Sequence, residues 1–261
     1  RINNGTRQLR KYRLEFSAYT PFYGLVLNST NNNLWPPTDE FGLKVMCVGD
    51  SFTEGANGLT NAPDSPQSYS MLLGDLLGWR ISAAGVSGTG YLQVSGMAKY
   101  RDRIVQDLSS TAPPGGNWDV IIIAGGINDA LGGFTAEQLQ AEVPLLYAAI
   151  RSVSTAVNAK IVVVLPVNFK AAQQLTQAKV DAIRVGWVST GGVAMIIDPV
   201  YGAEGAWFNG TGRVGAQTGD GNADFYLSAD GLHPSSSPNY SGGHDYFAYR
   251  IAQHLAGLSL L

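Results

Sequence analysis

The sequence predicts an α/β domain built on a doubly wound parallel sheet, and three observations carry this prediction. Short and nearly continuous apolar runs, typical of buried parallel strands, occur at residues 45–48, 120–124, 161–165 and 193–197. A weaker run at 79–84 adds a fifth strand. Segments with helical spacing of apolar residues separate these runs, and that β-α-β-α order is typical of a doubly wound sheet. The length of 261 residues suits one such domain, or one domain with a small appendage.

The helical segments are predicted at residues 65–77, 135–157, 171–189 and 243–256. The first opens with Ser65 as N-cap and Pro66 at the first helical position. The second opens with a capping box, in which Thr135 and Gln138 each satisfy a backbone N–H of the first turn. Pro144 should kink that helix or lie near its first turn.

The N-terminal part differs from the rest of the chain. Residues 12–27 read YRLEFSAYTPFYGLVL, which is aromatic and partly alternating, with breaks at Pro21 and Gly24. This pattern predicts short strands. We therefore divide the chain into a β-rich segment at 1–41, the end of a domain that lies upstream, and an α/β domain at 42–261.

Composition excludes several classes of partner and site. The net charge is −3 and no basic stripe is present, which argues against nucleic acid. No apolar run reaches the roughly 18 residues of a membrane span. The single Cys47 excludes an internal disulfide and a cysteine-based zinc site. The chain begins at Arg1 without a signal-peptide pattern, and we interpret it as a trimmed or processed chain.

A candidate nucleophile follows the first predicted strand. Ser51 comes directly after the run at 45–48, and ligands of open α/β sheets bind at the carboxyl ends of strands. Taken alone, Ser51 could equally be a capping residue. A nucleophilic serine needs a base, and His233 lies in a loop before the last helix, three residues after Asp230. This spacing lets the carboxylate reach the imidazole Nδ1 and leaves Nε2 free to face the serine.

Two further residues are candidates for stabilising an oxyanion. Asn128 follows the strand at 120–124, so its amide can donate at the same edge of the sheet. Gly88 follows the weaker strand, where a residue without a side chain lets a backbone N–H approach a ligand. The alternatives are a turn asparagine with local backbone bonds and a plain flexible loop.

Together these segments resemble the SGNH/GDSL hydrolase family. The four family blocks appear as VGDSF around Ser51, GVSGTG around Gly88, GGINDA around Asn128 and DGLHP around Asp230 and His233. The resemblance implies a three-layer α/β/α flavodoxin-like sandwich whose five parallel strands are ordered 2-1-3-4-5. It implies a catalytic triad of Ser51, His233 and Asp230, and an oxyanion hole formed by the Ser51 N–H, the Gly88 N–H and the Asn128 side chain. It implies no metal and no cofactor.

The chain departs from the family pattern after the histidine. Residues 235–241 intervene before the last helix and form an extra loop beside the predicted site. The N-terminal segment resembles the end of an accessory β-domain found in some carbohydrate-esterase members. We expect an extracellular, cell-surface or virion-associated protein.

The expected reaction is hydrolysis of short acyl esters, above all acetyl groups on a carbohydrate, with a small-molecule or polysaccharide ester as substrate. Aromatic residues in the loops near the site could stack on sugars. These residues are Tyr91, Tyr201, Trp207, Phe208 and Tyr226. The alternatives are an acyltransferase that uses the same site, and a carbohydrate-binding or virion structural module with a vestigial site. The segment 220–224 resembles the start of a calcium loop but lacks its later ligands, which favours a hydrogen-bonded turn.

Overall fold

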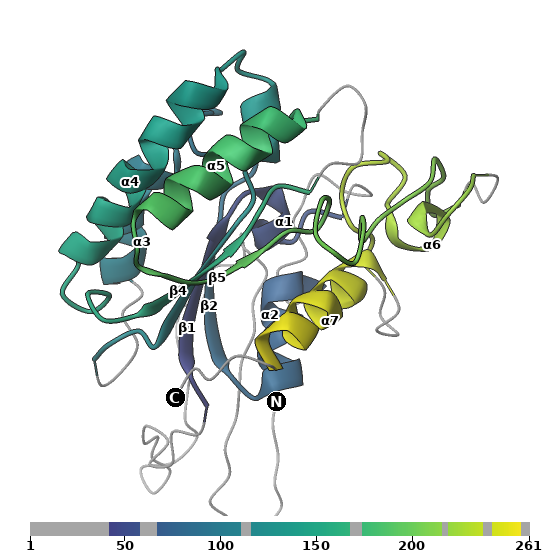
Figure 1. Ribbon diagram of the computed structural model, residues 1–261. Coiled ribbons are helices and arrows are strands. Elements are labelled where there is room, and N and C mark those ends of the chain that lie inside the picture. Colours follow the sequence, from purple (N-terminus) through teal and green to yellow (C-terminus); the bar gives the residue numbers. More distant parts are fainter. Residues whose placement is uncertain are drawn as a thin grey trace, which may run out of the picture.

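The computed structural model describes residues 42–57, 67–110, 116–167, 174–215, 219–236 and 242–256. Five parallel strands form one sheet in the order β2-β1-β3-β4-β5 (Figure 1). The strands are β1 (Lys44–Gly49), β2 (Arg80–Gly85), β3 (Val120–Ala124), β4 (Lys160–Val164) and β5 (Val193–Ile197). The predicted fold class and strand order are therefore confirmed. The predicted β segment at 1–41 lies outside the described residues.

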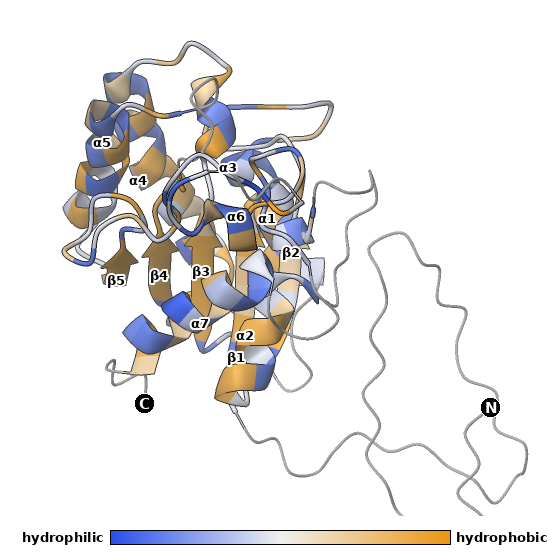
Figure 2. Ribbon diagram, turned by 90° about the vertical axis from the view of Figure 1, so that its right-hand side faces the viewer, coloured by the Kyte–Doolittle hydropathy of each residue, from blue (hydrophilic) through white to orange (hydrophobic). Residues whose placement is uncertain are grey.

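Burial along the strands explains why the sequence pattern is so clear. β3 reads VIIIA and all of its residues are buried, because helices cover both faces of a central strand. β2 lies at the edge of the sheet, where its residues are only partly buried, and its sequence signal is correspondingly weaker. Figure 2 shows β3, β4 and β5 in the orange of hydrophobic residues, and helices α4 and α5 as a mixture of orange and blue.

Helices cover the two faces of the sheet (Figure 1). Helices α3, α4 and α5 share one apolar cluster with β1, β3 and β4, whereas α2 and α7 share a second cluster on the other face. The helical elements are α1 (Ser51–Glu54), α2 (Tyr69–Leu77), α3 (Tyr100–Ser110), η2 (Ile127–Ala130), α4 (Ala136–Ser152), α5 (Gln177–Ser189), α6 (Ala223–Tyr226) and α7 (Gly243–Ala256). No described helix is long and apolar enough to cross a membrane.

The helix predictions were correct in position and partly wrong in their bounds. α7 has the predicted limits, and the capping box of α4 is present, with Thr135 Oγ1 accepting from the Gln138 N–H at 3.2 Å and Gln138 Oε1 accepting from the Thr135 N–H at 2.8 Å. α4 ends at Ser152 and runs on through the exposed Pro144. α5 begins only at Gln177, after the N-cap Thr176.

The helix predicted at residues 65–77 begins later than predicted. α2 starts at Tyr69 with Ser68 as N-cap, and the predicted Ser65 and Pro66 lie outside the described residues. Helix α3 was not predicted at all. It places Arg103 at the ends of two strands, where the buried guanidinium donates to the Ala84 and Gly49 carbonyls at 2.9 and 2.7 Å.

The register of the sheet positions the site. Gly49, the last residue of β1, pairs with Gly85 of β2 on one side and with Ala124 of β3 on the other. The carboxyl ends of the three strands are thus level. The segments that follow them, with Ser51, Gly88 and Asn128, leave the same edge of the sheet.

Candidate active site

The turn after β1 presents Ser51 at the start of α1. Asp50 is the N-cap of that helix, and its Oδ1 accepts from the Phe52 N–H at 3.1 Å. The turn is tight, because a Cβ on Gly49 would lie 2.1 Å from Thr53 Oγ1 and 2.2 Å from the Ala124 carbonyl oxygen. A glycine is therefore required at the point where the strand becomes a helix.

The carboxylate of Asp50 also reaches the neighbouring strand end. Its Oδ2 accepts from the Gly126 N–H at 3.0 Å and from the Tyr100 hydroxyl at 3.3 Å. Burial raises the pKa of Asp50, and the hydrogen bonds from the Phe52 and Gly126 N–H groups and from the Tyr100 hydroxyl oppose that rise. Asp50 belongs to the VGDSF motif, but no pattern in the sequence indicated these contacts.

Ser51, His233 and Asp230 form one hydrogen-bonded chain. The Nε2 atom of His233 lies 2.9 Å from Ser51 Oγ, and its Nδ1 lies 2.6 Å from Asp230 Oδ2. Ser51 is 6% exposed. These three side chains come from two segments 182 residues apart in the sequence, which the fold brings together.

Asp230 is held by donors on its other oxygen. Oδ1 accepts from the Ser228 hydroxyl at 2.7 Å, from the Leu232 N–H at 2.9 Å and from the His233 N–H at 3.0 Å. Burial raises the pKa of Asp230, but its bonds from His233, Leu232 and Ser228 outweigh burial and lower that pKa to about 2. The carboxylate is thus ionised at neutral pH and fixed in orientation.

Backbone contacts and one ring hold the histidine loop. Leu227 and Pro234 form an antiparallel bridge, and the Ser228 N–H donates to the His233 carbonyl at 2.9 Å. The ring of Phe52 lies 5.6 Å from the imidazole of His233, centroid to centroid, at an angle of 56°. Phe52 therefore packs against the base from the helix that carries Ser51, a contact that the sequence did not indicate.

The two predicted oxyanion residues lie on loops that touch each other. Asn128 is 5% exposed, and its Nδ2 donates to the Thr89 carbonyl at 2.9 Å. Thr89 follows Gly88, which has a φ of +76° and so adopts a conformation that favours glycine. The structure thus brings the Gly88 loop and the Asn128 turn together beside the turn of Ser51.

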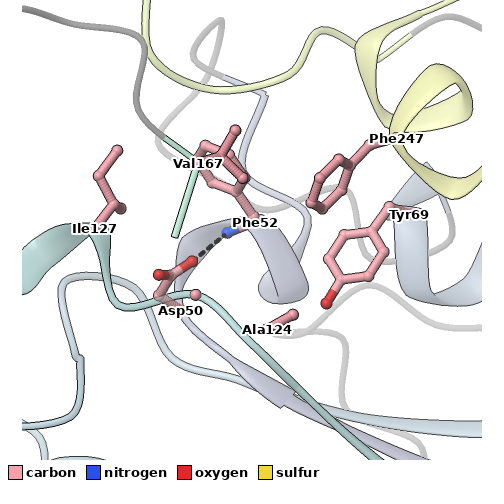
Figure 3. A pocket seen from close by; sticks show the side chains of 8 residues that line it. Asp50, Phe52, Tyr69, Ala124, Ile127, Val167 and Phe247 are labelled. Atoms are coloured by element: carbon pink, nitrogen blue, oxygen red, sulfur yellow. Dashed lines mark hydrogen bonds between the residues drawn. The ribbon is translucent and has the colours of Figure 1, made fainter. Parts of the chain in front are cut away.

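A small pocket adjoins the nucleophile turn (Figure 3). Its walls come from the ends of β1 and β3 and from helices α2 and α7, and they are largely apolar. The lining residues are Asp50, Phe52, Tyr69, Ala124, Gly125, Ile127, Val167 and Phe247. Ser51, Asn128 and His233 are not among them, so this pocket lies next to the hydrogen-bonded chain and does not contain it.

Comparison with known protein families decides the relationship. A model of the GDSL-like lipase/acylhydrolase family matches residues 47–237, which include Ser51, Gly88, Asn128, Asp230 and His233. The chain belongs to this family. Among curated proteins none matches the sequence.

Solved structures with the same fold include several carbohydrate esterases. Est24, a carbohydrate acetylesterase from Sinorhizobium meliloti, is 17% identical with a TM-score of 0.52, over 82% of this chain and 98% of that one. A family two carbohydrate esterase from Clostridium thermocellum is 18% identical with a TM-score of 0.54, over 83% of this chain and 64% of that one. A carbohydrate esterase family 2 enzyme with a carbohydrate-binding domain, from Corynascus thermopiles, is 16% identical with a TM-score of 0.57, over 87% and 70%. At these identities the likeness shows the fold, and with the family it supports an esterase or hydrolase.

Three of the aromatic residues predicted to contact substrate lie in the core of this GDSL-family domain. Tyr91, Trp207 and Phe208 are 0%, 2% and 3% exposed. The Tyr91 hydroxyl accepts from Trp187 Nε1 at 3.0 Å, and Trp207 packs on Phe247 with ring centroids 5.6 Å apart. No ring face of these residues is open to a substrate, so we assign them to packing.

The other two aromatic residues remain at the surface. Tyr226 is partly buried and stacks on Tyr246 with centroids 4.2 Å apart and planes within 5°. Tyr201 is 41% exposed. Of the predicted substrate contacts, Tyr226 lies nearest in sequence to Asp230, and the Tyr226 carbonyl accepts from the Ser235 N–H at 2.8 Å.

His244 has a structural position in the GDSL-family domain. It is fully buried, with Nδ1 3.2 Å from the Tyr69 N–H, so that Nε2 carries the proton and donates to the Ala56 carbonyl at 3.1 Å. Burial lowers its pKa to about 4, although the Ala56 bond opposes this. His244 thus joins α7 to α2 and to the segment after α1.

Among the described residues, no group of three or more His, Cys, Asp or Glu could hold a metal ion. The segment that resembled a calcium loop is a hydrogen-bonded turn. Asn209 and Asn222 exchange bonds, each side-chain Oδ1 accepting from the other residue's N–H at 2.9 Å.

Proposed function

We propose that this chain is a serine esterase that hydrolyses short acyl esters, with acetyl groups on a carbohydrate as its natural substrate class. The observation that carries the proposal is the hydrogen-bonded chain from Ser51 through His233 to Asp230, with distances of 2.9 and 2.6 Å. A serine hydroxyl is not ionised at neutral pH and needs a base. The hydrogen-bonded side chains supply both this base, His233, and the group that orients it, Asp230.

The proposed reaction proceeds through an acyl-enzyme. Ser51 Oγ attacks the ester carbonyl carbon while its proton passes to Nε2 of His233, and Asp230 stabilises the imidazolium that forms. The carbonyl oxygen becomes an oxyanion, for which the Ser51 N–H, the Gly88 N–H and Asn128 Nδ2 are the proposed donors. His233 then returns the proton to the departing alkoxide. Water, activated by His233, hydrolyses the acyl-enzyme and restores Ser51.

The substrate class rests on two kinds of support. Several proteins with the same fold are carbohydrate esterases by name, among them the acetylesterase from Sinorhizobium meliloti. The stacked pair of Tyr226 and Tyr246 is partly exposed, and Tyr226 lies four residues before Asp230 in the sequence. An aromatic surface of this kind suits the apolar face of a sugar ring.

The test compares acyl chains and then leaving groups. Hydrolysis of p-nitrophenyl acetate, butyrate and octanoate is measured for the wild type and for Ser51→Ala, followed by acetate release from acetylated polysaccharides. We expect the acetate to be preferred, release of acetate from a polysaccharide, and no turnover by Ser51→Ala. Turnover that survives in Ser51→Ala refutes the mechanism, and preference for octanoate refutes the substrate class.

A further inference from the structure

The loop that carries Gly88 is held by a carboxylate on its N-terminal side. Glu54, the last residue of α1, accepts through Oε2 from the Ser87 N–H at 2.8 Å and also from the Ser87 hydroxyl. Gly85 makes this reach possible, because a Cβ at that position would lie 2.0 Å from the Glu54 backbone nitrogen. The helix of Ser51 therefore lies directly against the end of β2, and its last side chain binds the residue before Gly88.

A second carboxylate holds the same loop on its C-terminal side. Asp129 is fully buried, and it accepts from three consecutive backbone N–H groups. Oδ2 accepts from Tyr91 at 2.8 Å, and Oδ1 accepts from Leu92 at 2.8 Å and from Gln93 at 2.7 Å. A Cβ on Gly90 would lie 2.5 Å from Asp129 Oδ2, so the loop can approach the carboxylate only because residue 90 is a glycine.

We infer that Glu54 and Asp129 are positioning residues that fix the Gly88 N–H from both sides for oxyanion binding, an inference that rests on the proposed function. Oxyanion donors are effective only when they are oriented before the reaction. Gly88 has a positive φ and no side chain, so its own conformational preference is weak. The bonds to Ser87 and to residues 91–93 supply the orientation that the glycine does not.

The geometry predicts different responses of the two carboxylates to amide substitution. Only Oε2 of Glu54 binds Ser87, and an amide oxygen in that place accepts both hydrogen bonds. Glu54→Gln should therefore keep the two bonds to Ser87, whereas Glu54→Ala loses them. Both oxygens of Asp129 accept backbone N–H groups, so Asp129→Asn must turn an NH₂ group toward a donor. If only the negative charge held the loop, Glu54→Gln and Asp129→Asn would both lower kcat as much as removal of the carboxylate side chain.

The experiment measures kcat and KM for p-nitrophenyl acetate and the affinity for phenylboronic acid, which forms a tetrahedral adduct on a nucleophilic serine. For Glu54→Ala and Asp129→Asn we expect kcat to fall roughly 10- to 100-fold, with KM within about threefold and boronate affinity weakened with kcat. Glu54→Gln should stay within about threefold of wild type in all three quantities. Glu137→Gln, an exposed glutamate in the first turn of α4, is the matched control and should change nothing.

Ser87→Ala tests the bond to Glu54 if Glu54→Ala fails to fold. Ser87 is exposed, and its substitution removes one of the two bonds to Glu54, so kcat should fall by a smaller factor than in Glu54→Ala. An unchanged kcat in Glu54→Ala and Ser87→Ala overturns the inference, as does a loss confined to KM. Equal losses in Glu54→Gln and Glu54→Ala also overturn it. Failure of the proposed function would appear separately, as activity that survives Ser51→Ala.

Discussion

Replacement of Asp230 by asparagine should inactivate the site by fixing the wrong tautomer of His233. Three donors surround Oδ1 of Asp230, namely the Ser228 hydroxyl and the N–H groups of Leu232 and His233. In Asp230→Asn the amide oxygen must occupy that place, because an NH₂ group there would face three donors. The NH₂ group then faces Nδ1 of His233, which becomes an acceptor. The imidazole proton moves to Nε2, and His233 can no longer accept the proton of Ser51.

The expected loss in kcat for p-nitrophenyl acetate is about 10³- to 10⁴-fold, as for an Asp→Asn change that imposes the wrong tautomer in a serine triad. Ser228→Ala is the matched control. It removes one donor at Oδ1 but leaves the carboxylate, so kcat should fall by less than about tenfold. If Asp230→Asn keeps a tenth or more of wild-type kcat while folded by circular dichroism, Asp230 does not set the tautomer and the assignment is wrong.

Asp230 also predicts how stability depends on pH. Its pKa in the folded chain, about 2, lies below the ordinary value, so its contribution is present above pH 4 and is lost as the pH falls through 2. Since the side chain is partly exposed, the contribution is on the order of 1–2 kcal/mol after solvent screening. Urea denaturation of wild type and Asp230→Asn should differ by this amount at pH 7 and converge toward pH 2, and a constant difference would contradict the assigned hydrogen bonds to an ionised Asp230.

Three further outcomes are expected. Asn128→Ala should lower kcat by on the order of 100-fold with little change in melting temperature, and a kcat within about threefold of wild type would make Asn128 a turn residue only. Trp207→Ala should lower the free energy of unfolding, measured by urea denaturation, by about 3–5 kcal/mol because the indole is buried. If the variant is instead fully stable and only its KM for acetylated polysaccharide rises, Trp207 is a substrate contact. Burial raises the pKa of Asp129 to about 6, although its three backbone hydrogen bonds lower it, and the nearby charge of Asp50 adds to the rise. The hydroxyls of Tyr91 and Tyr100 also lie near this carboxylate. As the pH falls through 6, protonation of Asp129 should loosen the Gly88 loop and lower kcat. Because the pKa is raised in the folded state, the contribution of Asp129 to the free energy of unfolding increases over the same range. The pH–rate profile of Asp129→Asn should therefore lack one protonation step that the wild type shows.

The sequence predicted those parts of the structure whose cause is local or depends on burial on both sides. A strand buried between two layers of helices must be apolar throughout, and so β3 was placed with its correct bounds. β5 lies at the edge of the sheet and is only partly buried, but its run VAMII is apolar throughout, and its bounds were correct as well. The capping box of α4 is equally local, since residues 135 and 138 satisfy each other. Three of the four blocks around the site follow strand ends, which meet at one edge of the sheet, whereas the block of Asp230 and His233 lies between α6 and α7 and was found through the family resemblance.

Other features depend on partners that are distant in sequence. α3 was missed because its buried face includes Arg103, whose guanidinium is satisfied by carbonyls of two strands that no periodicity reveals. Trp207 and Phe208 were expected at the substrate because they lie in a glycine-rich loop before Asp230. Such a loop has few side chains of its own to bury, and these two rings anchor it on α7 through Phe247. An aromatic residue that anchors a loop and one that contacts a ligand look alike until the packing is known.

Three carboxylates join the three segments that follow β1, β2 and β3 in a closed ring of hydrogen bonds. Asp50 links the turn after β1 to the turn after β3 through the Gly126 N–H. Asp129 links the turn after β3 to the loop after β2, and Glu54 links that loop back to the helix after β1. Each carboxylate is satisfied by donors on a neighbouring segment, so the ring couples the proposed oxyanion donors to one another. The segment of Asp230 and His233 is outside this ring, joined to it through Ser51 Oγ and the Phe52 ring. Orientation of the oxyanion donors and proton transfer therefore have separate supports, which is why changes at Glu54 and at Asp230 should weaken different steps of catalysis.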